Sequence, residues 1–414
     1  MKMRLFNLTG GKTLNYGWVV IGTLLVIDAI VMGVTFTMGI MLPVISDDLG
    51  ISLHQAGWLG AMNWEVTAVL TIPMAFRMAR FSPKKAVIIS GACQVVLLFA
   101  HGLAPNYWLL LFSRAAFMAS GLIRFAAYPL LTLQWFPARR IAFVNTVSTV
   151  VSGLAGGTVV FFMGDMLMAF GGWRNIFFIF GAVEALLLLA WMKLGRENPA
   201  PTTEKIYDMP EGIKVILKNK TLWLLGIGIM GDLLAFGAME TLWPKYATSL
   251  GIVSLSQAAY AEGLSYYGFM VGSLLGGLLS IKLGRRKPAI WLSGLLLPFV
   301  TLGILFSRSF PMLAFLWAMW GMCELYFPVV FTIPYELPGI RPRQVPIAEA
   351  FVVSIFTAGA GLGPVLGSYL AGALGSLQQA LIIIAVFPIL LFIAGLAIKE
   401  TGPAAVRKMA VTGD

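Results

Sequence analysis

Residues 106–140, NYWLLLFSRAAFMASGLIRFAAYPLLTLQWFPARR, form an apolar stretch that is long enough to cross a bilayer as a helix. Two arginines lie inside it, Arg114 about one third of the way along and Arg124 near the middle. An arginine at the centre of a membrane helix costs roughly 3 kcal/mol on insertion scales, so it must face protein or a wet cavity and have a partner. The stretch therefore predicts a helical membrane protein and makes Arg124 the first functional candidate.

The composition of the whole chain agrees with a membrane protein. Of its 414 residues 59% are hydrophobic and 11% are charged, whereas soluble domains carry about 25% charged residues. The net charge of +11 does not indicate a nucleic-acid partner, because the basic residues lie in short loops between apolar spans. Cys93 and Cys323 lie inside apolar spans, and His54 and His101 lie near span ends without ligand-like spacing. We therefore expect no disulfide, metal site or cofactor.

Apolar runs of about 20 residues or more, separated by polar loops, predict twelve transmembrane helices. They lie near residues 17–44, 54–78, 86–104, 107–134, 141–170, 174–194, 221–247, 257–281, 288–307, 311–337, 347–373 and 377–398. The only long polar connection, residues 195–220, divides them into six plus six. We expect an all-α polytopic membrane protein with two pseudo-symmetric six-helix bundles, 1–194 and 221–400, joined by the linker 195–220 and followed by a tail, 401–414.

The distribution of basic residues predicts the orientation. Of the 29 lysines and arginines, 24 lie at the N-terminus, in the linker, in the tail or in alternate loops, and only 3 lie in the other loops. Loops rich in lysine and arginine stay in the cytoplasm. The first apolar run is too long for a signal peptide and is expected to be retained. We therefore place the chain in the inner membrane with both termini and the linker in the cytoplasm.

Two basic loops carry related motifs. Residues 75–85, AFRMARFSPKK, are similar to a G-x-x-x-D-R-x-G-R/K-K pattern with Arg80 at its arginine, and residues 277–286, GLLSIKLGRR, repeat it in the second half with Arg285. With Arg114 early in the fourth helix, GWR at 172–174 and GLGPVLG at 361–367, the chain resembles the major facilitator superfamily over nearly its full length. That resemblance implies a secondary transporter that works by alternating access.

The sequence departs from the family's loop motif at one position, and its first span resembles one group of carriers within the family. The acid of the loop motif is replaced by Ala79 in the first copy and by Ile281 in the second. The family's cytoplasmic latch must therefore be weaker or built otherwise here, and we assign Arg80 and Arg285 to gating or structure. The opening YGWVV at 16–20 is similar to carriers of small anions such as monocarboxylates, oxalate and cyanate.

Five acids lie well inside predicted helices, where each is costly unless it is paired, protonated or wet: Asp28, Glu65, Asp232, Glu240 and Glu324. Asp28 and Asp232 occupy equivalent depths in the first helix of each half, and Arg124 and Glu324 each precede a proline in the fourth. In facilitator folds these helices line the central cavity. The resemblance therefore places Asp28, Arg124, Asp232 and Glu324 around one site.

Roles for these residues follow from their chemistry. Arg124 is expected to bind a substrate carboxylate through its planar guanidinium, the alternative being a structural pairing with Glu324 or Asp28. Asp28 and Asp232 are candidates for proton coupling. The alternative is that they form salt bridges or cap helices. Glu324 is a further substrate-binding candidate.

Four other side chains complete the list of predicted site residues. Tyr267 and Tyr326 lie near the middle of the eighth and tenth helices and are expected to form walls of the pocket. Glu65 lies in the second helix, at the expected interface between the halves, and is a candidate for gating. Arg114 is expected to be structural.

The leading hypothesis is a monomeric transporter that moves a small organic anion together with protons. A second is a proton-antiport exporter of cationic or amphiphilic compounds, because acids outnumber arginines at mid-depth. A third is a non-transporting receptor on a carrier scaffold. ATP coupling is not expected because the chain has no G-x-x-x-x-G-K-S/T loop. Nor is an enzyme expected, because two dispersed histidines and two buried cysteines cannot assemble a catalytic group.

Overall fold

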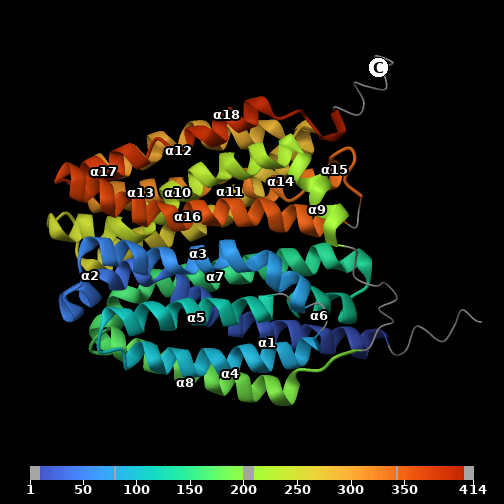
Figure 1. The fold of residues 1–414 in the computed structure, drawn as a ribbon, viewed down its shortest axis with the longest axis horizontal. Coiled ribbons are helices and arrows are strands. Elements are labelled where there is room, and N and C mark those ends of the chain that lie inside the picture. The colour runs from blue at the N-terminus through green and yellow to red at the C-terminus, as the bar shows by residue number, and fades with distance from the viewer. Residues whose placement is uncertain (1–9, 79–80, 126, 199–208, 342–343, 405–414) are drawn as a thin grey trace, which may run out of the picture.

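The computed structural model describes residues 10–78, 81–125, 127–198, 209–341 and 344–404, and these residues form helices joined by short loops (Figure 1). The helices before the linker are α1 (Gly10–Phe36), α2 (Met38–Leu49), α3 (Leu53–Met78), α4 (Pro83–Gly102), α5 (Tyr107–Phe125), α6 (Ala127–Trp135), α7 (Ala138–Ala169) and α8 (Trp173–Leu194). We call residues 10–194 the N-terminal half.

The linker contains one short helix, α9 (Met209–Lys218), with a strongly amphipathic sequence. After it come α10 (Lys220–Ser249), α11 (Leu255–Leu283), α12 (Lys287–Phe306), α13 (Phe310–Met322), α14 (Phe327–Val330), α15 (Ile333–Glu336), α16 (Val345–Leu374), α17 (Leu377–Ile384) and α18 (Ile389–Ala397). We call residues 220–397 the C-terminal half.

Several predicted spans are single crossings built from more than one helix. The first is α1 followed by α2, the fourth is α5 followed by α6, the tenth runs from α13 to α15, and the last is α17 followed by α18. Prolines explain two of the breaks: Pro129 and Pro328 cannot donate the backbone hydrogen bond that would continue the helix. Since both lie in the fourth span of their half, the two halves are broken at equivalent places.

The structure confirms a helical, multi-pass architecture. Among the described residues, 11 helical segments are long and apolar enough to cross a membrane. The predicted second span is present as α3, a helix of 26 residues, but it does not reach that degree of apolarity. Asn63 and Glu65 lie in its middle, and α3 packs between α5 and α16. A polar helix is tolerated there because protein covers it.

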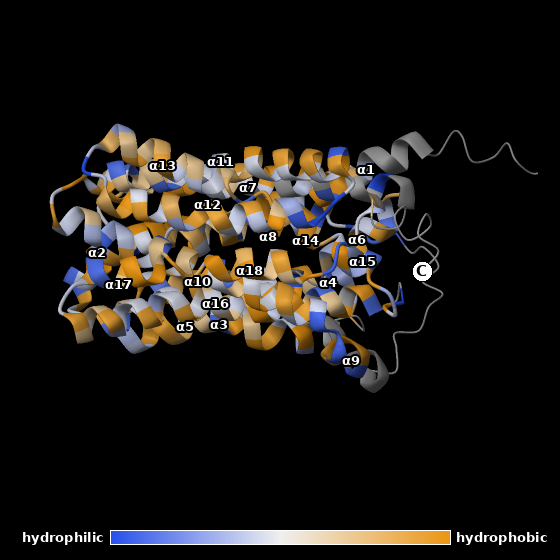
Figure 2. Ribbon diagram, turned by 90° about the horizontal axis from the view of Figure 1, so that it is seen from above, coloured by the Kyte–Doolittle hydropathy of each residue, from blue (hydrophilic) through white to orange (hydrophobic). Residues whose placement is uncertain are grey.

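The two halves lie side by side as layers of nearly parallel helices (Figure 1). They meet along two seams, where α3 packs against α16 and α7 packs against α11. The start of α1, α9 and the end of the described chain lie at one end of the molecule, which we call the linker end, while α2 and α17 lie at the opposite, far end. Hydrophilic residues gather toward these two ends, with apolar helices between them (Figure 2). This pattern suits a protein that crosses a bilayer.

Candidate functional site

Arg124 lies in the last turn of α5 and is buried, with a 1% exposed side chain. Its Nε donates a hydrogen bond to Asp28 Oδ1 at 2.7 Å, and its Nη1 donates to Gln94 Oε1 at 2.6 Å. The same Nη1 lies 3.4 Å from Glu184 Oε1. Side chains from α1, α4 and α8 therefore converge on one guanidinium, and we call these four residues the Arg124 cluster.

The Arg124 cluster holds two carboxyl groups against one positive charge. Glu184 is 1% exposed, whereas Asp28 is 27% exposed and is the accessible member. Glu184 Oε2 and Gln94 Nε2 have no hydrogen-bond partner within the described parts of the chain. Sequence reasoning had named Asp28 as an alternative partner of Arg124 but missed Gln94 and Glu184. The sequence feature that could have identified them is a polar side chain inside an apolar helix.

A second cluster lies in the C-terminal half around Asp232 of α10. The Tyr326 hydroxyl donates to Asp232 Oδ2 at 2.7 Å, and both residues are 0% exposed. Glu324, 4% exposed, interacts with both of them. The break between α13 and α14 places Glu324 and Tyr326 on the connecting turn that faces α10. Three residues predicted from sequence are thus brought together, and we call them the Asp232 cluster.

The four charged residues expected around one site are divided between these clusters. Asp28 and Arg124 pair within the N-terminal half, and Asp232 and Glu324 lie together within the C-terminal half. Among residues that the structure describes, no hydrogen bond or ion pair joins the two groups. Glu324 is therefore not the partner of Arg124 in this conformation.

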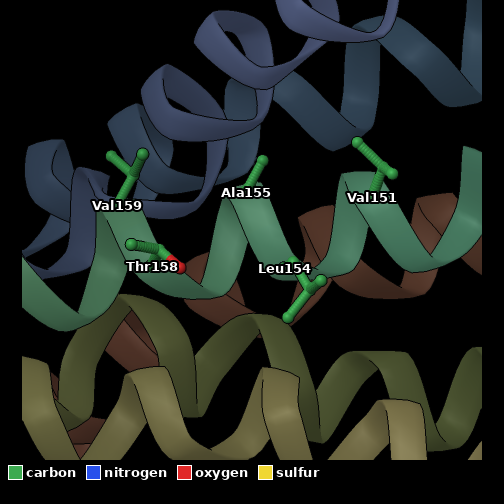
Figure 3. A pocket seen from close by; sticks show the side chains of 5 residues that line it. All are labelled: Val151, Leu154, Ala155, Thr158 and Val159. Atoms are coloured by element: carbon green, nitrogen blue, oxygen red, sulfur yellow. The ribbon is translucent and has the colours of Figure 1, made fainter. Parts of the chain in front are cut away.

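Tyr267 lies apart from both clusters, at the seam between α7 and α11. Its hydroxyl shares a hydrogen bond of 2.8 Å with Thr158 Oγ1. A shallow hollow of about 410 Å³ adjoins this contact, with mostly apolar walls on α7. In Figure 3 Val151, Ala155 and Val159 point to one side of α7 and Leu154 to the other. The hollow contains no residue of the charged clusters, so it is a packing feature of the seam.

Glu65 and Arg114 make contacts that can be compared with the roles predicted for them, gating and structure. Glu65 faces the other half, because a methyl group on Gly361 of α16 would lie 2.6 Å from Glu65 Oε1. Arg114 is 0% exposed and donates to three backbone carbonyls, those of Leu59 at 2.9 Å, Val34 at 3.2 Å and Thr35 at 3.4 Å. These bonds tie α5 to α1 and α3, which supports a structural role.

The loop arginines divide differently from the prediction. Arg80 lies outside the described residues, and Arg285 contributes its carbonyl, which accepts the Ser280 hydroxyl at 3.1 Å. The ion pair is made by the next residue: Arg286 Nη2 donates to Glu336 Oε1 at 2.6 Å. This hydrogen bond raises the pKa of Arg286 above the ordinary range for an arginine. The sequence did not single out Arg286, because register within a loop decides which arginine faces Glu336.

Two glutamates, one after the sixth span and one after the twelfth, accept hydrogen bonds at the N-termini of α4 and α12, the helices that follow the two basic loops. Glu400 Oε1 accepts the backbone N–H of Arg286 at 2.6 Å at the start of α12. Glu197 Oε1 accepts the backbone N–H of Lys84 at 2.7 Å at the start of α4, together with the Ser82 hydroxyl. A carboxylate at a helix N-terminus satisfies unpaired N–H groups and complements the helix dipole. The linker end thus has acidic partners although the loop motifs lack theirs.

A metal site has no support in the geometry. Within the described ranges, no group of three or more His, Cys, Asp and Glu side chains could hold a metal ion. Cys93 is exposed and Cys323 is buried beside Glu324.

Comparison with known proteins shows relatives along nearly the whole chain. An uncharacterized MFS-type transporter of Bacillus subtilis, YceJ, is 26% identical over 387 residues, which cover 89% of this chain and 92% of YceJ. A human sodium-dependent phosphate transport protein is 23% identical over 243 residues, covering 53% of this chain and 51% of that protein.

Solved structures show the same fold. A bacterial homologue of the human lysosomal transporter Spinster, inward-facing and unoccupied, superposes with a TM-score of 0.79 at 18% identity, covering 92% of this chain and 97% of that one. A variant of the nucleoside transporter NupG gives a TM-score of 0.74 at 13% identity over 92% and 99% of the two chains. The family model of the Major Facilitator Superfamily matches residues 24–264 and 241–411. The chain therefore belongs to the Major Facilitator Superfamily, a family of membrane transporters rather than enzymes.

Proposed function

We propose that this protein is a proton-coupled symporter of a small organic anion, located in the inner membrane with its termini and linker in the cytoplasm. Family membership supports transport by alternating access. The basic loops support the orientation, since the linker end carries them. One observation carries the substrate class: the accessible Asp28 occupies the Nε edge of the otherwise buried Arg124 at 2.7 Å.

The mutual position of the halves supports a state that is closed at the far end. There α2 packs against α10 and α11 of the other half. At the linker end, α6 packs against α1, α4, α5 and α7, whereas α14 packs against α11, α12 and α15. These segments contact their own halves. With the proposed orientation, these contacts support an inward-facing state.

The Arg124 cluster supplies a coupling mechanism. Protonation of Asp28 removes the charge that occupies the Nε edge of Arg124, and a substrate carboxylate can then take its place. Gln94 and Glu184 continue to hold Nη1 and keep the guanidinium in position. Because one proton and one anion enter together, the loaded cluster has the same net charge as the empty one. The movement between states therefore carries no additional buried charge, which would be costly in the membrane.

The Asp232 cluster favours a second candidate function, proton-antiport export of cationic compounds. Asp232 and Glu324 interact with each other and with Tyr326, and no basic side chain contacts them among the residues described. Two buried carboxyl groups without a base suit a cationic ligand or protons. The two functions differ in which cluster meets the substrate.

Charge movement in proteoliposomes on rapid solute exchange tests the proposal. One panel contains small carboxylates and inorganic anions, the other contains organic cations, and each is measured at two pH values. Because one proton accompanies one monovalent anion, we expect no net charge movement with the anion panel but pH-dependent tracer uptake of an anion, which Arg124→Gln abolishes. Normal anion affinity in that variant would remove Arg124 from the site. Arg308→Gln is the matched control, because Arg308 bonds the Tyr246 hydroxyl at 3.2 Å, away from the cluster.

Aspartate variants separate coupling from binding. In Asp28→Asn we expect counterflow to survive while proton-driven accumulation fails, and Asp232→Asn tests the same step in the other half. Unchanged accumulation in both would refute the coupling assignment. A response to cations alone, lost in Asp232→Asn but not in Arg124→Gln, would favour the exporter. Tracer uptake would follow a silent electrical record, because an electroneutral cycle moves no net charge.

A further inference from the structure

Two buried glutamates that the proposed mechanism does not use lie at the interface between the halves. Glu240 of α10 is 4% exposed and Glu262 of α11 is 1% exposed. Both carboxylate oxygens of Glu262, one of Glu240 and the hydroxyl of Tyr266 are buried and have no hydrogen-bond partner in the described chain. Glu240 interacts electrostatically with Glu262, and Tyr266 with both. Buried polar atoms without a partner are few in native proteins, and a bound proton, water or ion is among the explanations for them.

Among the described residues, Arg114 is the one positive charge that interacts with this pair. Arg114 of α5 interacts electrostatically with Glu240, and its guanidinium already donates to three backbone carbonyls. One guanidinium can balance one carboxylate, so a second ionised carboxylate would be buried without compensation. Addition of one proton makes the group of Arg114, Glu240 and Glu262 electrically neutral.

Four titratable groups on the neighbouring helices have contacts of their own. On α7, Asp165 accepts the Tyr260 hydroxyl at 2.5 Å, and on α2, Asp48 pairs with Arg174. Glu65 on α3 lies against Gly361 of α16. On α4, His101 interacts with Arg114, and its Nδ1 lies 2.6 Å from the Leu97 carbonyl. These groups give the glutamate pair no further counter-charge.

The group of Arg114, Glu240 and Glu262 draws on both halves. Arg114 belongs to the N-terminal half, and the two glutamates belong to the C-terminal half. The backbone beside each glutamate is in tight contact across the interface. A methyl group on Gly39 of α2 would overlap the Glu240 carbonyl oxygen, and one on Gly263 would lie 2.7 Å from Phe161 Cα of α7. Separation of the halves at this end would let water reach both carboxyl groups.

We propose that Glu240 and Glu262 form a proton-binding site that is occupied when the far end closes and is released to solvent when it opens. The proton neutralises the charge that closure would otherwise bury. Acidification on the far side therefore favours closure. This inference rests on the alternating access of the proposed function, but it concerns a different site from the Arg124 cluster and requires no substrate. A metal ion is not the ligand we expect, since two carboxylates and a phenol offer too few donors.

A distance measurement on the full-length protein in lipid nanodiscs, without substrate, tests the site. Spin labels go at Leu103→Cys and Leu250→Cys, which are 68% and 56% exposed at the far ends of α4 and α10, after Cys93→Ser removes the exposed native thiol. In the otherwise unchanged protein we expect the ratio of closed to open populations to fall, by up to about tenfold per pH unit for one linked proton, between about pH 5.5 and about pH 8.

Neutral replacements distinguish this site from other titrating groups. Glu262→Gln and, independently, Glu240→Gln should remain closed at both pH values, because neither can bury a second charge. Glu349→Gln is the matched control: it removes a half-buried glutamate of the same half that interacts with Tyr335 near the linker end, and it should keep the full pH response.

Three results would overturn the proposal. The first is a distance between the labels that does not change with pH. The second is a pH response that is the same in both glutamine variants as in the unsubstituted protein. The third is a protein that closes when sodium replaces choline at constant pH and does not respond to protons. None of them depends on transport. If the distance responds to pH as expected but no anion is transported in proteoliposomes, the proposed function is refuted and the proton site is retained.

Discussion

Gly39 of α2 provides the most direct test of closure at the far end. Its Cα lies so close to α10 that the Cβ of an alanine would overlap the Glu240 carbonyl oxygen and lie 3.2 Å from Thr241 Cα. These are backbone atoms, so they cannot rotate away as the tip of a side chain could. Gly39→Ala therefore requires α2 and α10 to separate. The open state, in which the two helices are already apart, bears no such cost.

The size of the effect follows from the nature of the clash. Insertion of one carbon into a packed interface costs about 1–3 kcal/mol. The cost applies to the closed state alone, so the closed-to-open ratio should fall by about 5- to 150-fold. We expect the population measured with labels at Leu103 and Leu250 to move to the longer distance, and transport to slow because closure has become the unfavourable step.

Gly22→Ala is the control for this measurement. Gly22 also lies in the first span, but an added Cβ there meets nothing within 4 Å. It should leave both the distance and the transport rate unchanged, although the change of residue type is identical. A distance distribution in Gly39→Ala that matches the unsubstituted protein, with full transport, would refute the claim that this contact closes the far end.

Three further changes test the remaining contacts. Tyr326→Phe removes the donor to Asp232 at 2.7 Å, and should lower the unfolding temperature, at a cost of about 1–3 kcal/mol, and alter the pH profile of uptake; an unchanged profile would contradict a coupling role. Glu336→Gln should cost about 1–2 kcal/mol. Because the pKa of Arg286 is raised, the stability from its charge is complete below the ordinary pKa of arginine and is lost only above it. The loss of stability in Glu336→Gln should therefore be equal in unfolding scans at about pH 6 and about pH 9. A difference between the two would implicate another group. Glu197→Gln should speed amide hydrogen exchange at the start of α4 but not at the start of α12. Exchange at α4 that equals that of the unsubstituted protein would contradict the capping role of Glu197.

Much of the architecture could be predicted because one physical rule governs it. Apolar runs must span the bilayer as helices, and polar loops cannot enter it. Even α3 was found, despite Asn63 and Glu65, since its length and flanks match a span. The breaks near Pro129 and Pro328 follow from proline chemistry. Reasoning about depth also predicted that Asp232 and Glu324 share a site and that Tyr326 lies near the middle of its helix.

Contacts between particular side chains required the tertiary structure. Depth along a helix can be counted from sequence, but the direction in which a side chain points depends on the rotation of each helix and on its neighbours. For this reason Gln94 and Glu184 were not predicted as partners of Arg124, and Arg286 rather than Arg285 meets Glu336. Tyr267 shared its depth with Tyr326 but faces α7 instead of the Asp232 cluster.

The sequence by itself determined that this chain is a multi-pass helical membrane protein, and it marked the charged residues that must be paired inside, because the cost of bare charge and unpaired backbone in lipid leaves few alternatives. Only the tertiary structure decided that Asp28 pairs with Arg124, and that Glu240 and Glu262 meet at the interface without partners. Those contacts depend on how each helix is rotated about its axis and on which helices pack beside it, and neither can be counted along the sequence.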